Sequence, residues 1–367
     1  MRINRRCTMT NIQKNPAAPD ASFWKKKAAA GFLMSVLIFF IHLSTFYNYS
    51  DTGNLMSAVN RLLALTFKEG FTRFVVPLYF IIAGALFFRD YSQEKYIPKL
   101  RKRVKTLLIP YLMWNIIWMI FCIVTSYTFL SKFFVGREKF EITPLNVLLS
   151  LIHHKCNGHF WFVFDLILFV VCSPVIDFLI RTRKRAICSI AVLALLSVMG
   201  YGIPASIFYT NTSIVYYLIG AAIGRYGFAY FLRPSALRVR IVSAAVLLGF
   251  GVFNVVFYEA FSGSVKWTIQ YVQYLLCGWA FWNVCDWIPD DSIIHSFSDC
   301  SFAVYAMHGN VGACITKLLY LVLPKSAYMA PVNFVLSVVL TLLFIKGFCL
   351  FTRRSMPKLH EMLMGSR

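Results

Sequence analysis

The side chains in this sequence that could carry chemistry are ionisable groups inside long apolar stretches. His42 lies in KKKAAAGFLMSVLIFFIHLSTFY, residues 25–47, about 22 Å along a helix from Lys27 and about two thirds of the way across a hydrocarbon core of about 30 Å. Arg73 and Asp165 lie in two further apolar stretches. An imidazole can act as a general base, a carboxylate can orient it, and a guanidinium can stabilise developing negative charge. These groups therefore predict proton-transfer chemistry at membrane depth.

The elements that must position these groups follow from the composition. Of the 367 residues, 59% are hydrophobic and 14% are charged, whereas about a quarter of a typical water-soluble domain is charged. We therefore predict a multi-pass membrane protein, whose lipid-embedded stretches must be helical because their backbone finds no water to bond. The apolar stretches predict an all-α bundle of about ten transmembrane helices, at 28–47, 68–88, 105–130, 160–180, 186–204, 212–232, 239–259, 267–288, 300–323 and 330–352.

The distribution of Lys and Arg predicts the orientation of this bundle. Basic residues gather in the N-terminal stretch, in RDYSQEKYIPKLRKRVK at 89–105, in RTRKR at 181–185 and near the C-terminus, and they are fewer in the alternate loops. By the positive-inside rule, both termini are expected in the cytoplasm. We expect a protein of the inner (cytoplasmic) membrane, with a disordered cytoplasmic tail at 1–24, a membrane domain at 25–352 and a cytoplasmic tail at 353–367.

The net charge of +22 comes from loops beside the membrane. No basic stretch is interleaved with stacking aromatics in a soluble domain, so the expected partner is the lipid bilayer and not a nucleic acid. Most of the 10 cysteines lie in apolar stretches without a CxxC pair and are predicted to be small buried hydrophobes. His153, His154 and His159 share a predicted outer loop, but no carboxylate or cysteine has a suitable spacing, so no metal site is expected.

The predicted topology places His42, Arg73 and Asp165 at one depth in the membrane. At helical rise, Arg73 and Asp165 lie about 8–9 Å below the outer boundary, and His42 reaches that level from the inside. Charge is costly there unless the groups pair or face water, so we predict a polar chamber open to the outer face. His308, about 12 Å from the inner face, would mark a second level of a path across the protein. The simpler alternatives are histidines that hydrogen-bond between helices and a structural Arg73–Asp165 ion pair.

Six short landmarks, spread over roughly 25–350, resemble the integral-membrane acyltransferase-3 family. They are His42 in the first span, VPLYFIIAGALFF at 76–88, KRVKTLLIPYLMWN at 102–115, HFWFVFDLILFVVCSPVI at 159–176, SIVYYLIGAAIGRY at 213–226 and SFAVYAMH at 301–308. Members of this family O-acylate cell-surface glycans. The resemblance implies transfer of an acyl group, usually acetyl, from acetyl-CoA or another acyl-CoA as co-substrate to a hydroxyl of a surface or lipid-linked glycan, without a bound cofactor.

The resemblance also implies roles for individual residues. His42 matches the catalytic histidine of the family, and its recurrent polar or aromatic positions fall here on Arg73, Arg103, Trp161, Asp165 and His308. His42 would take the proton of the hydroxyl, Asp165 would fix the tautomer of the imidazole, and Arg73 would stabilise the oxyanion. Trp161 and His308 are assigned to substrate or donor binding, with His308 beside the route of the pantetheine arm.

The CoA donor is expected to bind at the inner face. The predicted cytoplasmic turns carry Lys102, Arg103 and Lys105, joined by the cluster at 181–185, and such cations can hold phosphates. Two positions depart from the family pattern. The basic residue about three turns before the catalytic histidine is replaced by Gly31, which leaves Lys27 as a displaced substitute, and the serine at the end of the second span is replaced by Ala83.

Two other classes of function are compatible with the same residues. A proton-coupled transporter or flippase of a polysaccharide precursor would use the buried ionisable groups as a proton relay. Such a protein would favour repeated halves, and no internal repeat is evident in the sequence. A non-catalytic partner in a polysaccharide-synthesis complex is the third possibility. The enzyme requires acyl-CoA, whereas neither alternative does.

Overall fold

The computed structural model describes residues 21–43, 45–50, 53–133, 138–201, 212–289 and 291–365, of which 83% are helical and none forms a strand. The α-helices are α1 (Ala21–His42), α2 (Leu55–Leu63), α3 (Val75–Phe88), α4 (Tyr96–Arg103), α5 (Ile109–Tyr127), α6 (Pro144–Ile152), α7 (Trp161–Val171), α8 (Ser173–Leu179), α9 (Arg183–Val198), α10 (Ser213–Tyr226), α11 (Phe228–Leu232), α12 (Leu237–Phe257), α13 (Gly263–Val284), α14 (Ser292–Ser298), α15 (Ser301–Leu319), α16 (Met329–Ser355) and α17 (Pro357–Met364). The short 3₁₀ and π segments are η1 (Thr45–Tyr49), η2 (Ala64–Phe71), η3 (Gln93–Lys95), η4 (Val104–Leu108), η5 (Phe129–Phe133), η6 (Gly158–Phe160) and η7 (Cys285–Trp287).

The all-α architecture is confirmed. Fewer helices than the ten predicted have the length and apolarity needed to cross a membrane. Five such segments occur in the described ranges: Ala21–Tyr49, Leu55–Phe88, Gln93–Tyr127, Leu237–Phe257 and Met329–Ser355. A sixth is the pair Gly158–Val171 and Ser173–Leu179 if the two are counted as one span. Helices α9, α10, α13 and α15 occupy the other predicted stretches without meeting that criterion. Ten crossings and cytoplasmic termini therefore stay predictions.

The ends of several helices are encoded locally. Asn54 and Ser57 form a capping box at the start of α2, in which each side chain bonds the backbone of the other residue. The predicted span at 160–180 is instead bent by 71° between α7 and α8. Pro174, in the first turn of α8, accounts for the break because proline has no amide hydrogen and its ring clashes with the preceding turn.

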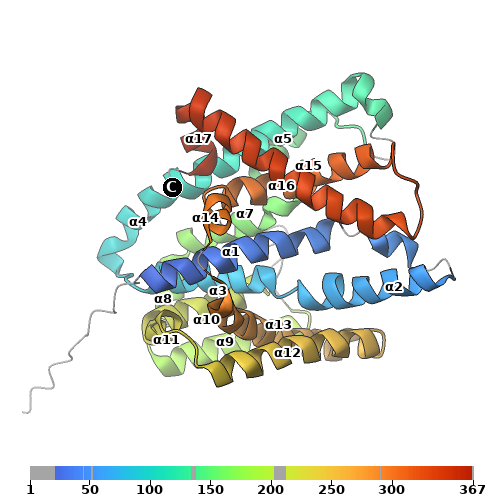
Figure 1. Cartoon of the computed structure of the whole chain (residues 1–367). Coiled ribbons are helices and arrows are strands. Elements are labelled where there is room, and N and C mark those ends of the chain that lie inside the picture. The colour runs from blue at the N-terminus through green and yellow to red at the C-terminus, as the bar shows by residue number, and fades with distance from the viewer. Residues whose placement is uncertain are drawn as a thin grey trace, which may run out of the picture.

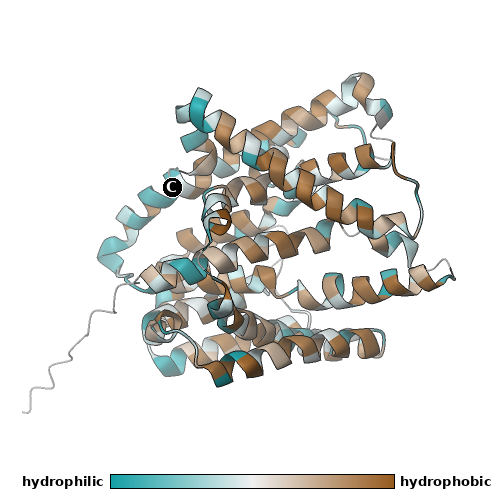
Figure 2. Cartoon of the chain, in the orientation of Figure 1, coloured by the Kyte–Doolittle hydropathy of each residue, from teal (hydrophilic) through white to brown (hydrophobic). Residues whose placement is uncertain are grey.

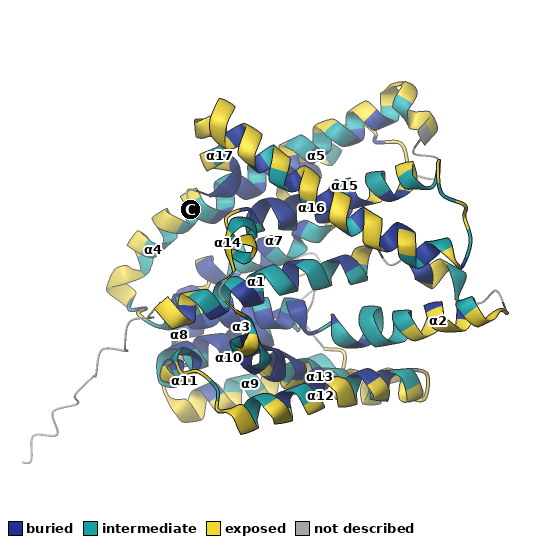
Figure 3. Ribbon diagram, in the orientation of Figure 1, coloured by how far each residue is buried: buried dark blue, intermediate teal, exposed yellow. Residues whose placement is uncertain are grey.

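The long helices lie side by side, with α1 in the middle of the bundle (Figure 1). Helix α1 contacts α3 on one side and α14 and α15 on the other. Hydrophilic residues gather at one end of the bundle, where α1 begins and along α4 (Figure 2). Helix α3 is mostly buried, whereas α12 and α16 expose much of their surface (Figure 3). The apolar exposed surface fits contact with lipid, since a lipid-facing helix has no need to hide apolar side chains.

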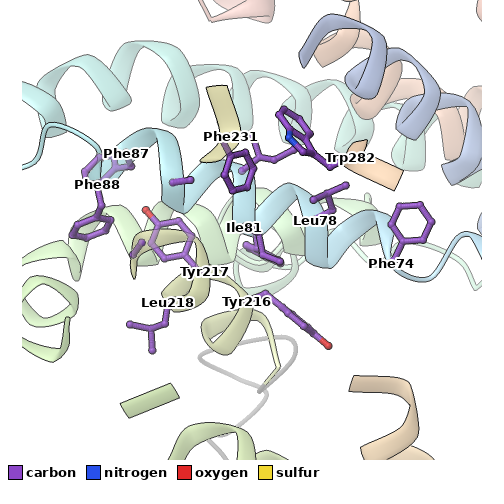
Figure 4. Close-up of a cluster of buried hydrophobic side chains, with 14 of the residues drawn as sticks. Phe74, Leu78, Ile81, Phe87, Phe88, Tyr216, Tyr217, Leu218, Phe231 and Trp282 are labelled. Atoms are coloured by element: carbon purple, nitrogen blue, oxygen red, sulfur yellow. The ribbon is translucent and has the colours of Figure 1, made fainter. Parts of the chain in front are cut away.

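One of the two buried apolar clusters surrounds α3 and α10, and its side chains include Ile81, Tyr217 and Trp282 (Figure 4). The two helices approach so closely that a Cβ added at Gly220 would overlap the backbone of Ile81. The same holds for Gly84 against Tyr217 and for Gly224 against Ala85. Small residues allow such contact between helical backbones. The hydrophobic effect does not bring helices together in lipid, so close packing of this kind stabilises the pair.

The second buried cluster joins the end of α1 to α5, α15, α16 and α17. The Trp114 indole donates to the carbonyl oxygen of Leu363 at 3.1 Å, and the Trp118 indole donates to that of Ala306 at 3.0 Å. The predicted tail at 353–367 is therefore, up to residue 365, the end of α16 followed by the packed helix α17. Most of the predicted tail at 1–24 lies outside the described residues, and from Ala21 onward the chain is already helix α1.

Candidate functional site

Three histidines from distant parts of the chain meet at one point. His42 is the last residue of α1, His159 lies in η6 just before α7, and His308 lies in the middle of α15. The ring centroids are 4.0 Å apart for His42 and His159, 4.9 Å for His159 and His308, and 5.1 Å for His42 and His308. His308 is 1% exposed, His159 is half-buried, and His42 is exposed. We call these residues the histidine cluster.

Two glycines on α15 make room for the cluster. A Cβ added at Gly309 would overlap the ring of His159, and one added at Gly312 would overlap the side chain of Leu43, which follows His42. Glycine thus lets η6 and the end of α1 lie directly on α15. The buried ring of Phe39, one turn before His42, meets the edge of His308 with the centroids 5.8 Å apart.

Tyr305 connects the two buried members of the cluster. Its hydroxyl donates to the carbonyl oxygen of His159 at 2.6 Å, and its ring stacks on Phe160 with centroids 5.3 Å apart. Its own carbonyl oxygen lies 2.7 Å from Nδ1 of His308, which must therefore carry the hydrogen because a carbonyl can only accept. The neutral His308 ring then keeps its lone pair on Nε2. Tyr305 is a positioning residue that the sequence did not reveal.

Arg73 lies near the cluster but is paired with a residue that the sequence did not predict. Its Nη2 atom is 2.8 Å from Oε2 of Glu69, which also accepts a hydrogen bond from the Tyr258 hydroxyl at 3.1 Å. Glu69 belongs to the π-helix η2, a type of segment that often occurs at functional sites. Arg73 and Lys68 both act electrostatically on His42. Two cations therefore lie within electrostatic range of the exposed imidazole.

Asp165 is fully buried and contacts a different helix. Its Oδ2 atom accepts a hydrogen bond from Oγ of Ser213 at 2.7 Å, which ties α7 to α10. Asp165 also acts electrostatically on Tyr305, which contacts the cluster. The structure thus gathers His159 and His308 around His42, where the sequence predicted Arg73 and Asp165.

The depth predicted for His308 is wrong, because its ring lies beside that of His42. The prediction assumed that α1 and α15 begin at the same membrane boundary. Instead the short helix α14 packs against α1, and α15 begins only after it, well along the length of α1 (Figure 1). Eight residues of α15 therefore reach the level that α1 reaches at its end.

The four basic residues predicted to bind the donor are not part of the cluster, unlike His308, for which the same role was predicted. Lys102 and Lys105 are exposed, while Arg103 is half-buried with its guanidinium carbon 5.9 Å from the centre of the Phe87 ring. Lys27 is half-buried and its ammonium lies 5.2 Å from the Trp24 ring. They belong to α1, α4 and η4, around the hydrophilic end of the bundle (Figure 2).

Trp161 lies nearer the cluster, since it begins α7 directly after η6. It is half-buried, and its ring centroid is 6.1 Å from that of Phe80 in α3. Its neighbour His159 was predicted only as one of three loop histidines without a metal partner. The signal that could have revealed His159 is the glycine beside His308, which predicts that another segment comes close there. His159 fills that space.

The comparison with known families decides the class of protein. The family model described as an acyltransferase domain, acyltransferase-3, matches residues 32–346, well over half of the chain. The chain belongs to the acyltransferase-3 family. No curated protein and no solved structure gives a significant match. This acyltransferase is therefore a membrane protein whose matched region contains the whole histidine cluster and each predicted site residue except Lys27.

Proposed function

We propose that this acyltransferase moves an acyl group, acetyl in the simplest case, from a cytoplasmic acyl-CoA to a hydroxyl of a cell-surface or lipid-linked glycan. His42 is the general base in this proposal. The supporting observation is an exposed imidazole at the end of a long apolar helix, backed by two further imidazoles and flanked by Arg73 and Lys68. Ionisable side chains among apolar membrane helices are costly, so they usually take part in chemistry or transport.

The reaction needs a base because a sugar hydroxyl is a weak nucleophile. The neutral His42 ring removes the hydroxyl proton as the oxygen attacks the carbonyl carbon of the thioester, which typically contributes 10²–10⁴-fold in rate. The new C–O bond forms, the C–S bond breaks, and the CoA thiolate leaves with the proton that His42 returns. The products are the glycan ester and free CoA, so atoms and charge balance.

The oxyanion that forms on the way carries negative charge beside Arg73. A guanidinium in a water-poor site stabilises such charge more than it would in water. The ion pair with Glu69 holds Arg73 in place and balances its charge when no oxyanion is present. Asp165 stabilises the surroundings of Tyr305 in this arrangement, His308 lies beside His42, and Trp161 lines the approach to the cluster.

The donor is proposed to bind at the hydrophilic end of the bundle. Lys102, Arg103 and Lys105 present three cations within about one turn, where α4 ends and η4 begins, and the phosphate groups of CoA are ligands that such cations prefer. The pantetheine arm would then extend along α1 towards His42. The positive charge of this end also supports a cytoplasmic position for it under the positive-inside rule.

The test compares cells that lack the protein with cells that produce it. We expect a base-labile ester on the surface polysaccharide only when the protein is present, and incorporation of label from radioactive acetyl-CoA into glycan in isolated membranes. His42→Gln should abolish both while leaving protein level and thermal unfolding unchanged, and His153→Gln in the outer loop serves as the matched histidine control. Full activity of His42→Gln would contradict the general-base role, and glycan transport without acyl-CoA would favour the flippase.

A further inference from the structure

The three rings of the histidine cluster are arranged as the ligands of a metal ion could be. One nitrogen from each of His42, His159 and His308 can be chosen so that all three lie within 4.8 Å of one another. The rings come from three separate segments, so their convergence is a property of the folded protein and not of a local sequence motif. Three imidazoles that share one small space repel each other if more than one is protonated. They are compatible as neutral ligands around a cation.

The buried member of the cluster supplies an independent observation. Nε2 of His308 is buried and has no hydrogen-bond partner among the described residues, although buried polar atoms are almost always paired. Its Nδ1 hydrogen is held by the backbone carbonyl of Tyr305 at 2.7 Å, with the carbonyl of Val304 at 3.2 Å. A ring nitrogen that donates to a carbonyl while the other presents its lone pair is the usual arrangement of a metal-binding histidine.

We propose that His42, His159 and His308 bind one divalent transition-metal ion, with Zn²⁺ as the best fit. Imidazole nitrogen is a preferred ligand of zinc, whereas Mg²⁺ and Ca²⁺ require oxygen ligands. A tetrahedral zinc ion with three histidines keeps a fourth position open for water or a substrate oxygen. The exposed side of this cluster is that of His42, so the open position faces away from the buried His308.

Closing the site requires small movements only. Zinc–nitrogen bonds of about 2.0–2.1 Å place ligand nitrogens roughly 3.3 Å apart in a tetrahedron, so the widest separation must shrink by about 1.5 Å. His42 can provide this by rotating its ring, because it is exposed and ends its helix. Arg73 and Lys68 oppose a cation here, and Glu69 offsets the charge of Arg73. The site is therefore expected to bind zinc less tightly than one surrounded by carboxylates.

The proposed metal site depends on the proposed function only for its part in acyl transfer. A bound ion would make His42 a ligand and not the general base, and the chemistry it would supply is to polarise an oxygen at its open position. Metal binding itself needs neither donor nor acceptor, so it can be measured on the purified protein without any acyl-transfer assay. A failure of the acyltransferase assay and a failure of metal binding are thus separate results.

The experiment measures the metal content of the detergent-purified protein and its affinity for Zn²⁺. Protein stripped with a chelator is titrated with Zn²⁺ and its bound metal is counted by mass spectrometry, and Co²⁺ in place of Zn²⁺ reports coordination through its visible absorption bands. We expect one ion per chain. His42→Gln, His159→Gln and His308→Gln should each weaken binding at least tenfold and remove the Co²⁺ bands, while His153→Gln and His295→Gln should bind like the wild type.

A second variant tests the geometry without removing a ligand. Gly309→Ala places a methyl group where the His159 ring lies, so it should weaken Zn²⁺ binding, whereas the matched Gly347→Ala, which meets nothing within 4 Å, should not. His42→Gln and Gly309→Ala keep the test decisive even if His308→Gln fails to fold. A wild-type protein that binds no stoichiometric zinc, or a His42→Gln variant that binds it unchanged, would overturn the proposal.

Discussion

Arg73 and Glu69 form an ion pair one helical turn apart, with 2.8 Å between Nη2 and Oε2. Glu69 also accepts a hydrogen bond from the hydroxyl of Tyr258, so it links η2 to the end of α12. The side chain of Glu69 is 11% exposed and that of Arg73 is 36% exposed. Arg73 therefore keeps part of its side chain exposed, while Glu69 is almost covered.

The first prediction separates the catalytic role of Arg73 from its structural role. Arg73→Ala should lower acyl transfer by about 10²–10³-fold, the usual loss when one oxyanion-stabilising group is removed. It should also lower the thermal midpoint, because Glu69 is left buried without its cation. Adding Glu69→Gln should restore the midpoint but not the rate. A double variant with wild-type acyl transfer, measured with labelled acetyl-CoA, would remove Arg73 from the mechanism.

The second prediction concerns Tyr305 as a positioning residue. Tyr305→Phe removes the hydroxyl that donates to the carbonyl of His159, while the ring and the carbonyl that holds His308 stay in place. We expect kcat to fall about tenfold with KM for the donor unchanged, since the bond orients a group but does not bind substrate. Tyr328→Phe, at an exposed tyrosine, is the control. Equal kcat values for Tyr305→Phe and wild type would show that the hydroxyl bond is dispensable.

The third prediction concerns the proposed CoA-binding end. Arg103→Glu should weaken acyl-CoA binding at least tenfold at low ionic strength, and the difference should shrink as salt is added because salt screens charge interactions. Lys358→Glu, in the exposed first turn of α17, controls for the overall change in charge. Binding is measured by titration of the purified protein with CoA. If Arg103→Glu and wild type bind CoA equally at low salt, the basic turn serves topology alone.

The fourth prediction is a pH dependence that arises outside the membrane-spanning segments. Burial lowers the pKa of His154, in the loop before η6, to about 4, with a further contribution from His153. The unfolded value is about 6.5, so the folded state binds fewer protons and stability falls as the pH drops from 6.5 towards 4. By pH 5 this one group should cost about 2 kcal/mol.

The matching variant for this pH dependence is His154→Asn. His154 has a φ of 49°, in the left-handed region that asparagine adopts more readily than most residues, so the backbone should be preserved. The thermal midpoint of His154→Asn should fall less steeply between pH 7 and 5 than that of the wild type. Parallel curves would show that His154 does not govern acid stability.

Much of the fold could be predicted from the sequence because apolar helices in lipid obey one strong rule. A backbone without water must bond within itself, so each long apolar stretch becomes a helix, and helices occur at all ten predicted positions. The break at Pro174 and the early start of the second helical segment at Leu55 were not predicted. The first depends on how one proline is accommodated, and the second on an amphipathic helix that hydropathy alone does not reveal.

The site was harder to predict because counting residues along a helix gives the depth of a side chain in the membrane but not the direction in which it points. His42 was expected to meet Arg73 and Asp165, whereas the rings beside it are those of His159 and His308. Which side chains meet is decided by helix rotation and by small residues such as Gly309, and neither can be counted along the chain. His308 was placed too far inside because the position of α14 was unknown.

The close contact between α3 and α10 limits how this protein can move. At Gly220 and Gly224 the two main chains touch with no side chain between them, so neither helix can slide or roll without overlap of atoms. Any opening that the proposed acyl transfer requires is therefore expected away from the contact between α3 and α10. These two helices form a fixed frame within the bundle.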